Sequence, residues 1–247
     1  MDTLLILLAA FSAGILNTIA GGGTFLTFPA LVFIGMPPVM ANATSAVAVF
    51  PGYLGGAFGY RKELARFDQK QAAKLIGVTL AGGLIGSLLL LVSSNEAFSA
   101  VVPFLLLAAT LVFLFGESIR HWAAKKSRAV TPFGAMGLLL VSVYGGYFNG
   151  GLGIVLLALF ALWGMVDIHE MNGLKTGLSF VLSAISVAVF AIGGLVEWYN
   201  AVVMMIAATI GGYAGAPIAR ALPKSAIRWL VALVGFTMSA VFFWRLL

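Results

Sequence analysis

The chain has 247 residues, of which 62% are apolar and only 9% are charged, and its mean hydropathy is +1.09. A water-soluble core of this size does not require so apolar a composition, so the sequence predicts an integral membrane protein. The absence of cysteine excludes disulfides, thiolate chemistry and Cys-based metal or iron–sulfur sites.

The basic residues predict a membrane topology rather than a nucleic-acid partner, although the formal charge is +6. Twelve of the fourteen Lys and Arg residues lie in three short segments between apolar runs: Arg61, Lys62, Arg66, Lys70 and Lys74; Arg120, Lys125, Lys126 and Arg128; and Arg220, Lys224 and Arg228. Such segments face the cytoplasm and acidic lipid. The loops near Glu96 and Glu197 have no Lys or Arg and are expected outside. We therefore expect a multi-pass protein of the cytoplasmic (inner) membrane that contacts the bilayer and no nucleic acid, with a homodimer left open.

The first apolar segment, residues 3 to 35, must return to the outer side from which it enters. It has about 33 residues, fewer than the roughly 40 that two full helical crossings take. A sharp reversal inside it needs residues without a Cβ, and Gly21, Gly22 and Gly23 supply them. A re-entrant hairpin fits these constraints best, and a pair of short tilted helices satisfies the same charge pattern.

Three spans follow this hairpin, and the second half of the chain repeats the arrangement from the cytoplasmic side. The predicted spans are 40 to 60, 71 to 92 and 97 to 115, then a second hairpin at 132 to 165, then 168 to 192, 199 to 220 and 225 to 245. The predicted fold is therefore an all-α polytopic membrane protein built as an inverted repeat. Residues 1–116 form the first membrane repeat, 117–131 a cytoplasmic basic linker and 132–247 the second membrane repeat.

Internal similarity supports two equivalent halves. The sequence Gly-Gly-Gly-Thr at 21–24 corresponds to Gly-Gly-Leu-Gly at 150–153, 129 positions later, and each is followed by an apolar stretch that ends in Gly-Met. One inserted residue then aligns Asn42 with Asn172 and Phe50 with Phe180. The cluster Gly82, Gly83 and Gly86 corresponds to Gly211, Gly212 and Gly215 at the same spacing of 129. Such a repeat in a very apolar chain points to a transporter.

The glycine tips of the two hairpins predict a binding cavity. Non-helical backbone at membrane depth is tolerated only where it is buried in protein or lines a watery cavity. Phe25 to Gly35 and Ile154 to Gly164 form two half-helices, each about 16 Å long, whose N-termini favour an anion. Close helix packing is the alternative role for glycine. We prefer packing for the clusters at 82–86 and 211–215, and a functional role for the tips.

Polar residues near the tips are the candidate substrate-binding groups. They are Asn17, Gly21, Gly22, Gly23, Thr24, Asn42, Thr44, Ser45, Asn149, Gly150, Gly151, Gly153, Asn172, Lys175 and Thr176. Lys175 lies about two turns into a span, where a buried ammonium is costly and indicates function. Alternatively, it snorkels to the cytoplasmic surface and pairs with Asp167 or Glu170. The sequence leaves these two roles open.

The segment from Asn17 to Ser45 closely resembles the signature of the sulfite exporter TauE/SafE family of membrane permeases. The resemblance rests on the tip glycines, Pro29, Gly35 and the run Ala-Asn-Ala-Thr-Ser at 41–45, and extends over essentially the whole chain. It is weaker in the second half, where Leu152 interrupts the glycine run and Ala158 replaces Pro29. The resemblance implies transport of sulfur-containing anions such as sulfite, sulfonates or sulfoacetate across a bacterial-type cytoplasmic membrane.

Other classes fit the residues less well. An intramembrane enzyme needs a nucleophile and base, or paired carboxylates, at membrane depth, and both His and all eight acids lie at or near loops or span ends. A cation permease would require carboxylates at the tips, and a purely structural or partner-binding protein would not need polar tips. We therefore predict a secondary transporter for a small anion, with another anion or a cation as alternative substrates, and expect no cofactor and no metal.

Overall fold

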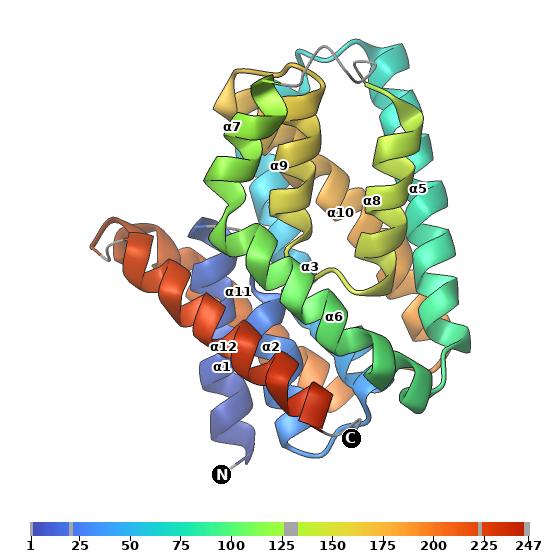
Figure 1. Ribbon diagram of the computed structural model, residues 1–247, viewed down its shortest axis with the longest axis vertical. Helices are drawn as coiled ribbons and strands as arrows, with labels where there is room; N and C mark the ends of the chain where they lie inside the picture. Colours follow the sequence, from blue (N-terminus) through green and yellow to red (C-terminus); the bar gives the residue numbers. More distant parts are fainter. Residues whose placement is uncertain (1, 20–21, 126–132, 222–223, 245–247) are drawn as a thin grey trace.

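The computed structural model describes residues 2–19, 22–125, 133–221 and 224–244, and none of these residues forms a strand (Figure 1). The described residues form α1 (Asp2–Ile19), α2 (Thr24–Phe33), α3 (Pro38–Gly59), α4 (Arg61–Leu64), α5 (Gln69–Val92), α6 (Asn95–Leu114), α7 (Gly116–Lys125), α8 (Ala135–Tyr147), α9 (Leu152–Leu162), α10 (Ile168–Ile192), α11 (Trp198–Ala221) and α12 (Lys224–Trp244). The all-α fold class is confirmed. The six predicted spans correspond to α3, α5, α6, α10, α11 and α12, with ends within two residues of those expected.

Polar side chains mark the start of the long helices. Asp68 accepts a hydrogen bond from the Gln71 amide at α5, and Ser94 accepts one from the Ala97 amide at α6. The carboxylate of Asp167 accepts from the first amides of α10. Such caps satisfy amides that have no partner within the helix. Among the described residues, α5, α6 and α10 are long and apolar enough to cross a membrane.

Two helical hairpins lie at the predicted places. The arms α2, α8 and α9 have 10, 13 and 11 residues, or about 15 to 20 Å at 1.5 Å per residue, short of a hydrocarbon core of about 30 Å. The α1 arm is longer, at 18 residues. The α1–α2 hairpin opens toward the end of the molecule where the N-terminus lies, and the α8–α9 hairpin opens toward the opposite end (Figure 1).

The Gly-Met pair in each half ends the short arm of its hairpin. Gly35 and Gly164 have φ of 90° and 85°, a left-handed conformation that glycine adopts without strain. The Met36 amide bonds to the Leu31 carbonyl, and the Met165 amide bonds to the Phe160 carbonyl at 3.0 Å. These are Schellman caps. The repeated dipeptide is therefore a helix-termination signal used twice.

Helices of the first half pack mainly on helices of the second half. The α1 helix lies along α11, α5 along α8, α6 along α12 and α3 along α10. Glycines permit the close approaches: a Cβ on Gly82 would lie 2.8 Å from the Leu139 carbonyl oxygen, and a Cβ on Gly86 or Gly211 would overlap backbone of α8 or α1. The packing role preferred for these clusters is confirmed for Gly82, Gly83, Gly86 and Gly211, whereas Gly212 also borders a cavity. For Gly215 it stays a prediction. Two hydrophobic clusters, each with residues from both halves, form the interior. The repeat boundaries at 116 and 132 remain predictions.

Hydrogen bonds show which loops share an end of the molecule. At one end the Val39 amide donates to Asn95, and the Glu197 amide donates to the Thr44 hydroxyl at 3.0 Å. At the other end Arg66 pairs with Glu170 at 3.6 Å. The two lysine-free loops therefore lie together, as expected, and the first basic loop lies beside the start of α10. Which end faces the cytoplasm remains a prediction.

Candidate functional site

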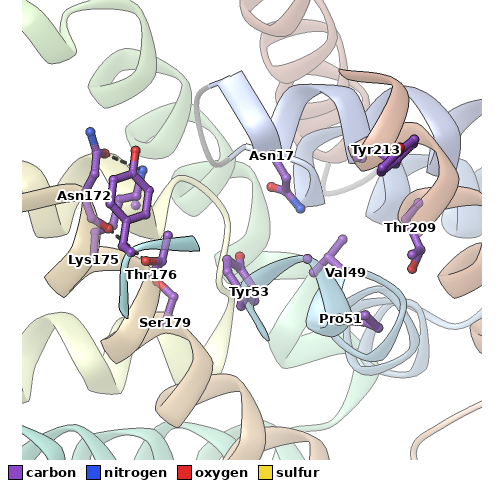
Figure 2. A pocket seen from close by; sticks show the side chains of 16 residues that line it. Asn17, Val49, Pro51, Tyr53, Asn172, Lys175, Thr176, Ser179, Thr209 and Tyr213 are labelled. Atoms are coloured by element: carbon purple, nitrogen blue, oxygen red, sulfur yellow. Dashed lines mark hydrogen bonds between the residues drawn. The ribbon is translucent and has the colours of Figure 1, made fainter. Parts of the chain in front are cut away.

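A cavity of about 600 Å³ lies between α1, α3, α10 and α11, with Gly153 of α9 also at its wall (Figure 2). Its lining residues are Gly14, Asn17, Val49, Pro51, Gly52, Tyr53, Tyr60, Gly153, Asn172, Lys175, Thr176, Ser179, Ala208, Thr209, Gly212 and Tyr213. Elements from both halves of the chain therefore build one cavity.

The polar side of this cavity is a single face of α10. Asn172, Lys175, Thr176 and Ser179 follow the spacing of residues that share one helix face, and Figure 2 shows them grouped at one side of the cavity. The Lys175 ammonium donates to Asn172 Oδ1 at 3.0 Å. The Thr176 hydroxyl donates to the backbone carbonyls of Asn172 and Gly173.

Lys175 does not form the surface ion pair with Asp167 or Glu170 that the sequence leaves open. Glu170 pairs with Arg66, and the Asp167 carboxylate caps the start of α10. The side chain of Lys175 instead lies at the cavity wall, beside the amide of Asn172. The pairing of Lys175 with Asp167 or Glu170 is therefore wrong, while snorkelling itself stays an open alternative.

At the first hairpin tip, fewer backbone amides are free to bind a ligand than the glycine run predicts. Asn17, near the end of α1, accepts a hydrogen bond from the Gly23 amide at 2.7 Å and so caps the start of α2. A Cβ on Gly23 would lie 2.6 Å from the Asn17 side-chain nitrogen. Asn17 itself lines the cavity. The amide of Gly23, which was predicted to be free for a ligand, is occupied by this side chain because the hairpin reverses so tightly.

The second tip reaches the cavity through Gly153. Gly151 has φ of 71° and Asn149 has φ of 56°, so the turn uses two left-handed residues, and Asn is one of the few non-glycine residues that tolerate that conformation. The Tyr144 hydroxyl donates to the Gly150 carbonyl. The cavity residue Tyr53 donates to Asn149 Oδ1 at 3.5 Å, which links the cavity wall to this tip.

Of the predicted site residues, the structure brings Asn17, Gly153, Asn172, Lys175 and Thr176 to the cavity wall. Three polar residues of α3 are used elsewhere. Asn42 donates to the Tyr147 carbonyl at the end of α8, Thr44 accepts from the Glu197 amide, and the Ser45 hydroxyl lies 2.6 Å from that of Thr27.

The remaining predicted site residues lie near the tips without lining the cavity. They are Gly22, Gly23, Thr24, Asn149, Gly150 and Gly151, whereas Gly21 lies outside the described residues. Both tips contact the same helix: a Cβ on Gly22 would lie 3.2 Å from Phe113, and one on Gly151 would lie 3.4 Å from Ala109, one turn away on α6. The tips thus converge, as predicted, but pack on α6 rather than both opening into the cavity.

Several cavity residues were missed by the sequence reasoning. Ser179 had a usable signal, because it lies one turn beyond Lys175 on the same helix face. Tyr53, Thr209 and Tyr213 had none, since they are brought to the cavity by packing of α3 and α11. Pro51 also lines the cavity, and its ring nitrogen cannot donate to the Val47 carbonyl within α3.

The charge of the cavity wall is positive. Lys175 is the one lining residue, among the described residues, with a formal charge, and no Asp, Glu or His lines the cavity. The described residues contain no group of three or more His, Cys, Asp or Glu that could hold a metal ion. This arrangement offers an anion a charged donor and gives a cation no carboxylate.

A bundle of apolar helices that contains two short-armed helical hairpins and a polar internal cavity is the architecture of a multi-pass membrane transporter. The chain belongs to the sulfite exporter TauE/SafE family, whose model matches residues 6–242. It is 31% identical over 242 residues to a probable membrane transporter protein of Haemophilus influenzae, with 97% of this chain and 94% of the relative covered.

Further relatives carry similar names. A probable membrane transporter protein, YfcA, of Escherichia coli K12 is 28% identical over 238 residues, covering 94% of this chain and 86% of the relative. A probable membrane transporter protein, ORF9, of a Sinorhizobium species is 26% identical, covering 94% of this chain and 88% of the relative. No solved structure matches this chain.

Proposed function

We propose that the protein is a secondary transporter, a permease that moves small sulfur-containing anions such as sulfite, sulfonates or sulfoacetate across the cytoplasmic membrane. The observation that carries this proposal is Lys175, which lies in the cavity beside Asn172 with no carboxylate among the lining residues. A charged ammonium there binds an anion more strongly than a neutral donor does. Family membership supports the choice of sulfur anions.

The substrate-binding group in this proposal is the face of α10, completed by Asn17 and Gly153. Asn172 positions the Lys175 ammonium, and the Ser179 hydroxyl lies on the same face of α10 as a neutral hydrogen-bonding group. The remaining tip residues act indirectly, because they fix the hairpin turns that place Asn17 and Gly153. Catalysis is not part of this proposal.

The proposed orientation places the basic loops in the cytoplasm and the loops near Glu96 and Glu197 outside. The opposed hairpins and the reciprocal packing of α1 on α11 and α8 on α5 support an inverted repeat. In such transporters the site lies between the repeats, as this cavity does.

Counterflow in proteoliposomes tests the function. Vesicles are loaded with unlabelled sulfite, methanesulfonate, sulfoacetate or acetate, and entry of radiolabelled methanesulfonate is measured. We expect saturable counterflow with sulfur anions and less with acetate. Equal counterflow with all four would favour a general small-anion permease, and counterflow of sodium instead would overturn the anion assignment.

A further inference from the structure

Among the described residues that line the cavity, none is a counter-ion for Lys175. Its described partner is the neutral amide oxygen of Asn172. The acid closest along α10, Glu170, is paired with Arg66 at 3.6 Å. Glu63 of α4 packs its Cβ toward Gly173, on the neighbouring face of α10, and does not line the cavity.

Among the described residues that line the cavity, the further titratable groups are tyrosines. Tyr53 comes from α3, Tyr60 follows α3, and Tyr213 comes from α11, while α1 and α9 contribute Asn17 and glycines. A tyrosine hydroxyl is a hydrogen-bonding group rather than a counter-ion for an ammonium. The described lining residues therefore provide no negative charge to balance that of the Lys175 ammonium.

An ammonium has three N–H donors, and only Asn172 Oδ1 is a described acceptor. The neighbouring Thr176 hydroxyl donates to two backbone carbonyls of α10. A charge that is partly withdrawn from water and unpaired is costly. A bound anion removes this cost by pairing with the ammonium. When the anion leaves, the ammonium loses its proton more readily than it does in the paired state, and the resulting amine can still donate to Asn172.

We propose that Lys175 couples transport to protons, so that one proton crosses the membrane with each monovalent anion. This inference rests on the proposed function. Lys175 as a neutral amine takes a proton from water as the anion binds, which forms an ammonium–anion pair of zero net charge. On the far side the anion dissociates, the ammonium returns its proton to water, and the amine is restored. The cycle is an electroneutral proton–anion symport.

Proteoliposomes test this coupling with methanesulfonate, an anion of a strong acid that carries no proton of its own. An inward methanesulfonate gradient should acidify the lumen, reported by trapped pyranine, without needing valinomycin and potassium to compensate charge. With an alkaline lumen, uptake should approach about tenfold accumulation per pH unit, as one-to-one coupling requires. Uptake that needs valinomycin and leaves the luminal pH unchanged would overturn the coupling and indicate a uniporter.

The Lys175→Arg variant isolates the role of the proton. Arginine keeps its charge at any accessible pH, so this variant should retain at least a tenth of wild-type counterflow but lose accumulation driven by the pH gradient. Lys62→Arg, in the exposed basic loop, is the matched control and should behave as wild type. If Lys175→Arg accumulates methanesulfonate as wild type does, Lys175 is not the proton carrier. If Lys175→Arg does not fold, the coupling is decided by the wild-type protein alone, from the luminal pH that pyranine reports and from whether uptake needs valinomycin. Absence of wild-type counterflow would contradict the proposed function itself.

Discussion

Phe50 of α3 and Phe180 of α10 stack face to face, with ring centroids 5.4 Å apart and planes 12° apart. These are the two residues that the internal repeat aligns with each other. In a protein with a two-fold relation between its halves, equivalent residues meet each other only at the axis. The stack therefore marks where such an axis would pass, between the helices that form two walls of the cavity.

The stack should behave as one coupled pair. Phe50→Leu and Phe180→Leu should each lower the melting temperature by a similar amount, because each removes the same ring contact. A double-mutant cycle on stability should give a coupling of about 0.5 to 1.5 kcal/mol, the usual value for an aromatic pair. Phe104→Leu is the control, since its ring contacts Phe243 and is distant in sequence from both positions. Additive losses within about 0.3 kcal/mol would show that the rings do not interact.

The left-handed glycine at the second tip should be required for transport. Gly151→Val forces a β-branched residue to adopt a φ of 71°, at a cost of about 1 to 3 kcal/mol. Gly194→Val is a matched control, since Gly194 has φ of 69° in the loop after α10 and a Cβ there would meet nothing within 4 Å. Both variants should lose stability, but only Gly151→Val should lose methanesulfonate counterflow. Equal counterflow in the two variants would show that the conformation of the second tip does not affect the binding site.

Removing the charge of Lys175 should weaken anion binding. Lys175→Gln keeps a polar side chain of similar length, and the loss of a charge-assisted hydrogen bond should cost about 1 to 3 kcal/mol, or roughly five- to 150-fold in affinity. Lys62→Gln is the control for a lost surface charge. The measurement is the concentration of methanesulfonate that half-saturates counterflow. An unchanged half-saturating concentration for Lys175→Gln would mean that neutral donors such as Asn172 and Ser179 bind the anion without help from the charge.

Close contact between α5 and α8 should tolerate no side chain at Gly86. A Cβ there would overlap the Val143 carbonyl oxygen, and overpacking costs about 1 to 3 kcal/mol or more. Gly77→Leu on the same helix meets nothing within 4 Å and is the control. We expect Gly86→Leu to be recovered in low yield with a reduced melting temperature, whereas Gly77→Leu purifies as wild type. Normal behaviour of Gly86→Leu would mean that α5 and α8 are not in this register.

Single cysteines test the orientation cleanly, because the chain has no native cysteine. Lys62→Cys and Glu96→Cys place thiols in exposed positions at opposite predicted sides of the membrane. In intact bacterial cells whose outer membrane has been permeabilised, a membrane-impermeant maleimide should label Glu96→Cys and not Lys62→Cys. Lysis should make both reactive. Labelling of Lys62→Cys alone before lysis would invert the topology.

The sequence predicts most of the helices here because its signals are local. Span lengths, the Gly-Met endings and the basic loops each depend on neighbouring residues, and they place helix ends within a few residues. The hydrogen-bond partner of each residue in a pair of repeat-equivalent polar residues is not determined by its neighbours in sequence. Asn42 and Asn172 are equivalent in the repeat, yet Asn42 binds the Tyr147 carbonyl and Asn172 holds Lys175 in the cavity. What distinguishes them is that Asn42 lies within hydrogen-bond reach of the end of α8, whereas Asn172 faces the cavity.

The same limit applies to the hairpin tips. Glycine runs predict a reversal, but they do not reveal whether the exposed amides stay free. Asn17 caps the first tip because the α1 and α2 arms cross closely there. Tyr53 enters the cavity wall because α3 passes the second tip. The first contact joins residues six positions apart but depends on how the tip reverses, and the second joins residues 96 positions apart. Hydrophobic periodicity reports neither.

The proline in α3 divides that helix into two parts with different mechanical freedom. The first turns are anchored through Val39 to Asn95 and through Thr44 to Glu197. Beyond Pro51 lie Gly52 and Tyr53, where the helix lacks one internal hydrogen bond and borders open space. Beyond the proline, the Tyr53 hydroxyl ties α3 to Asn149 of the second tip, so motion of that tip would bend the helix at Pro51, where it is weakest. Any rocking of the hairpins during transport should therefore leave the anchored turns of α3 in place and swing its other end, so that the cavity wall itself is the moving part.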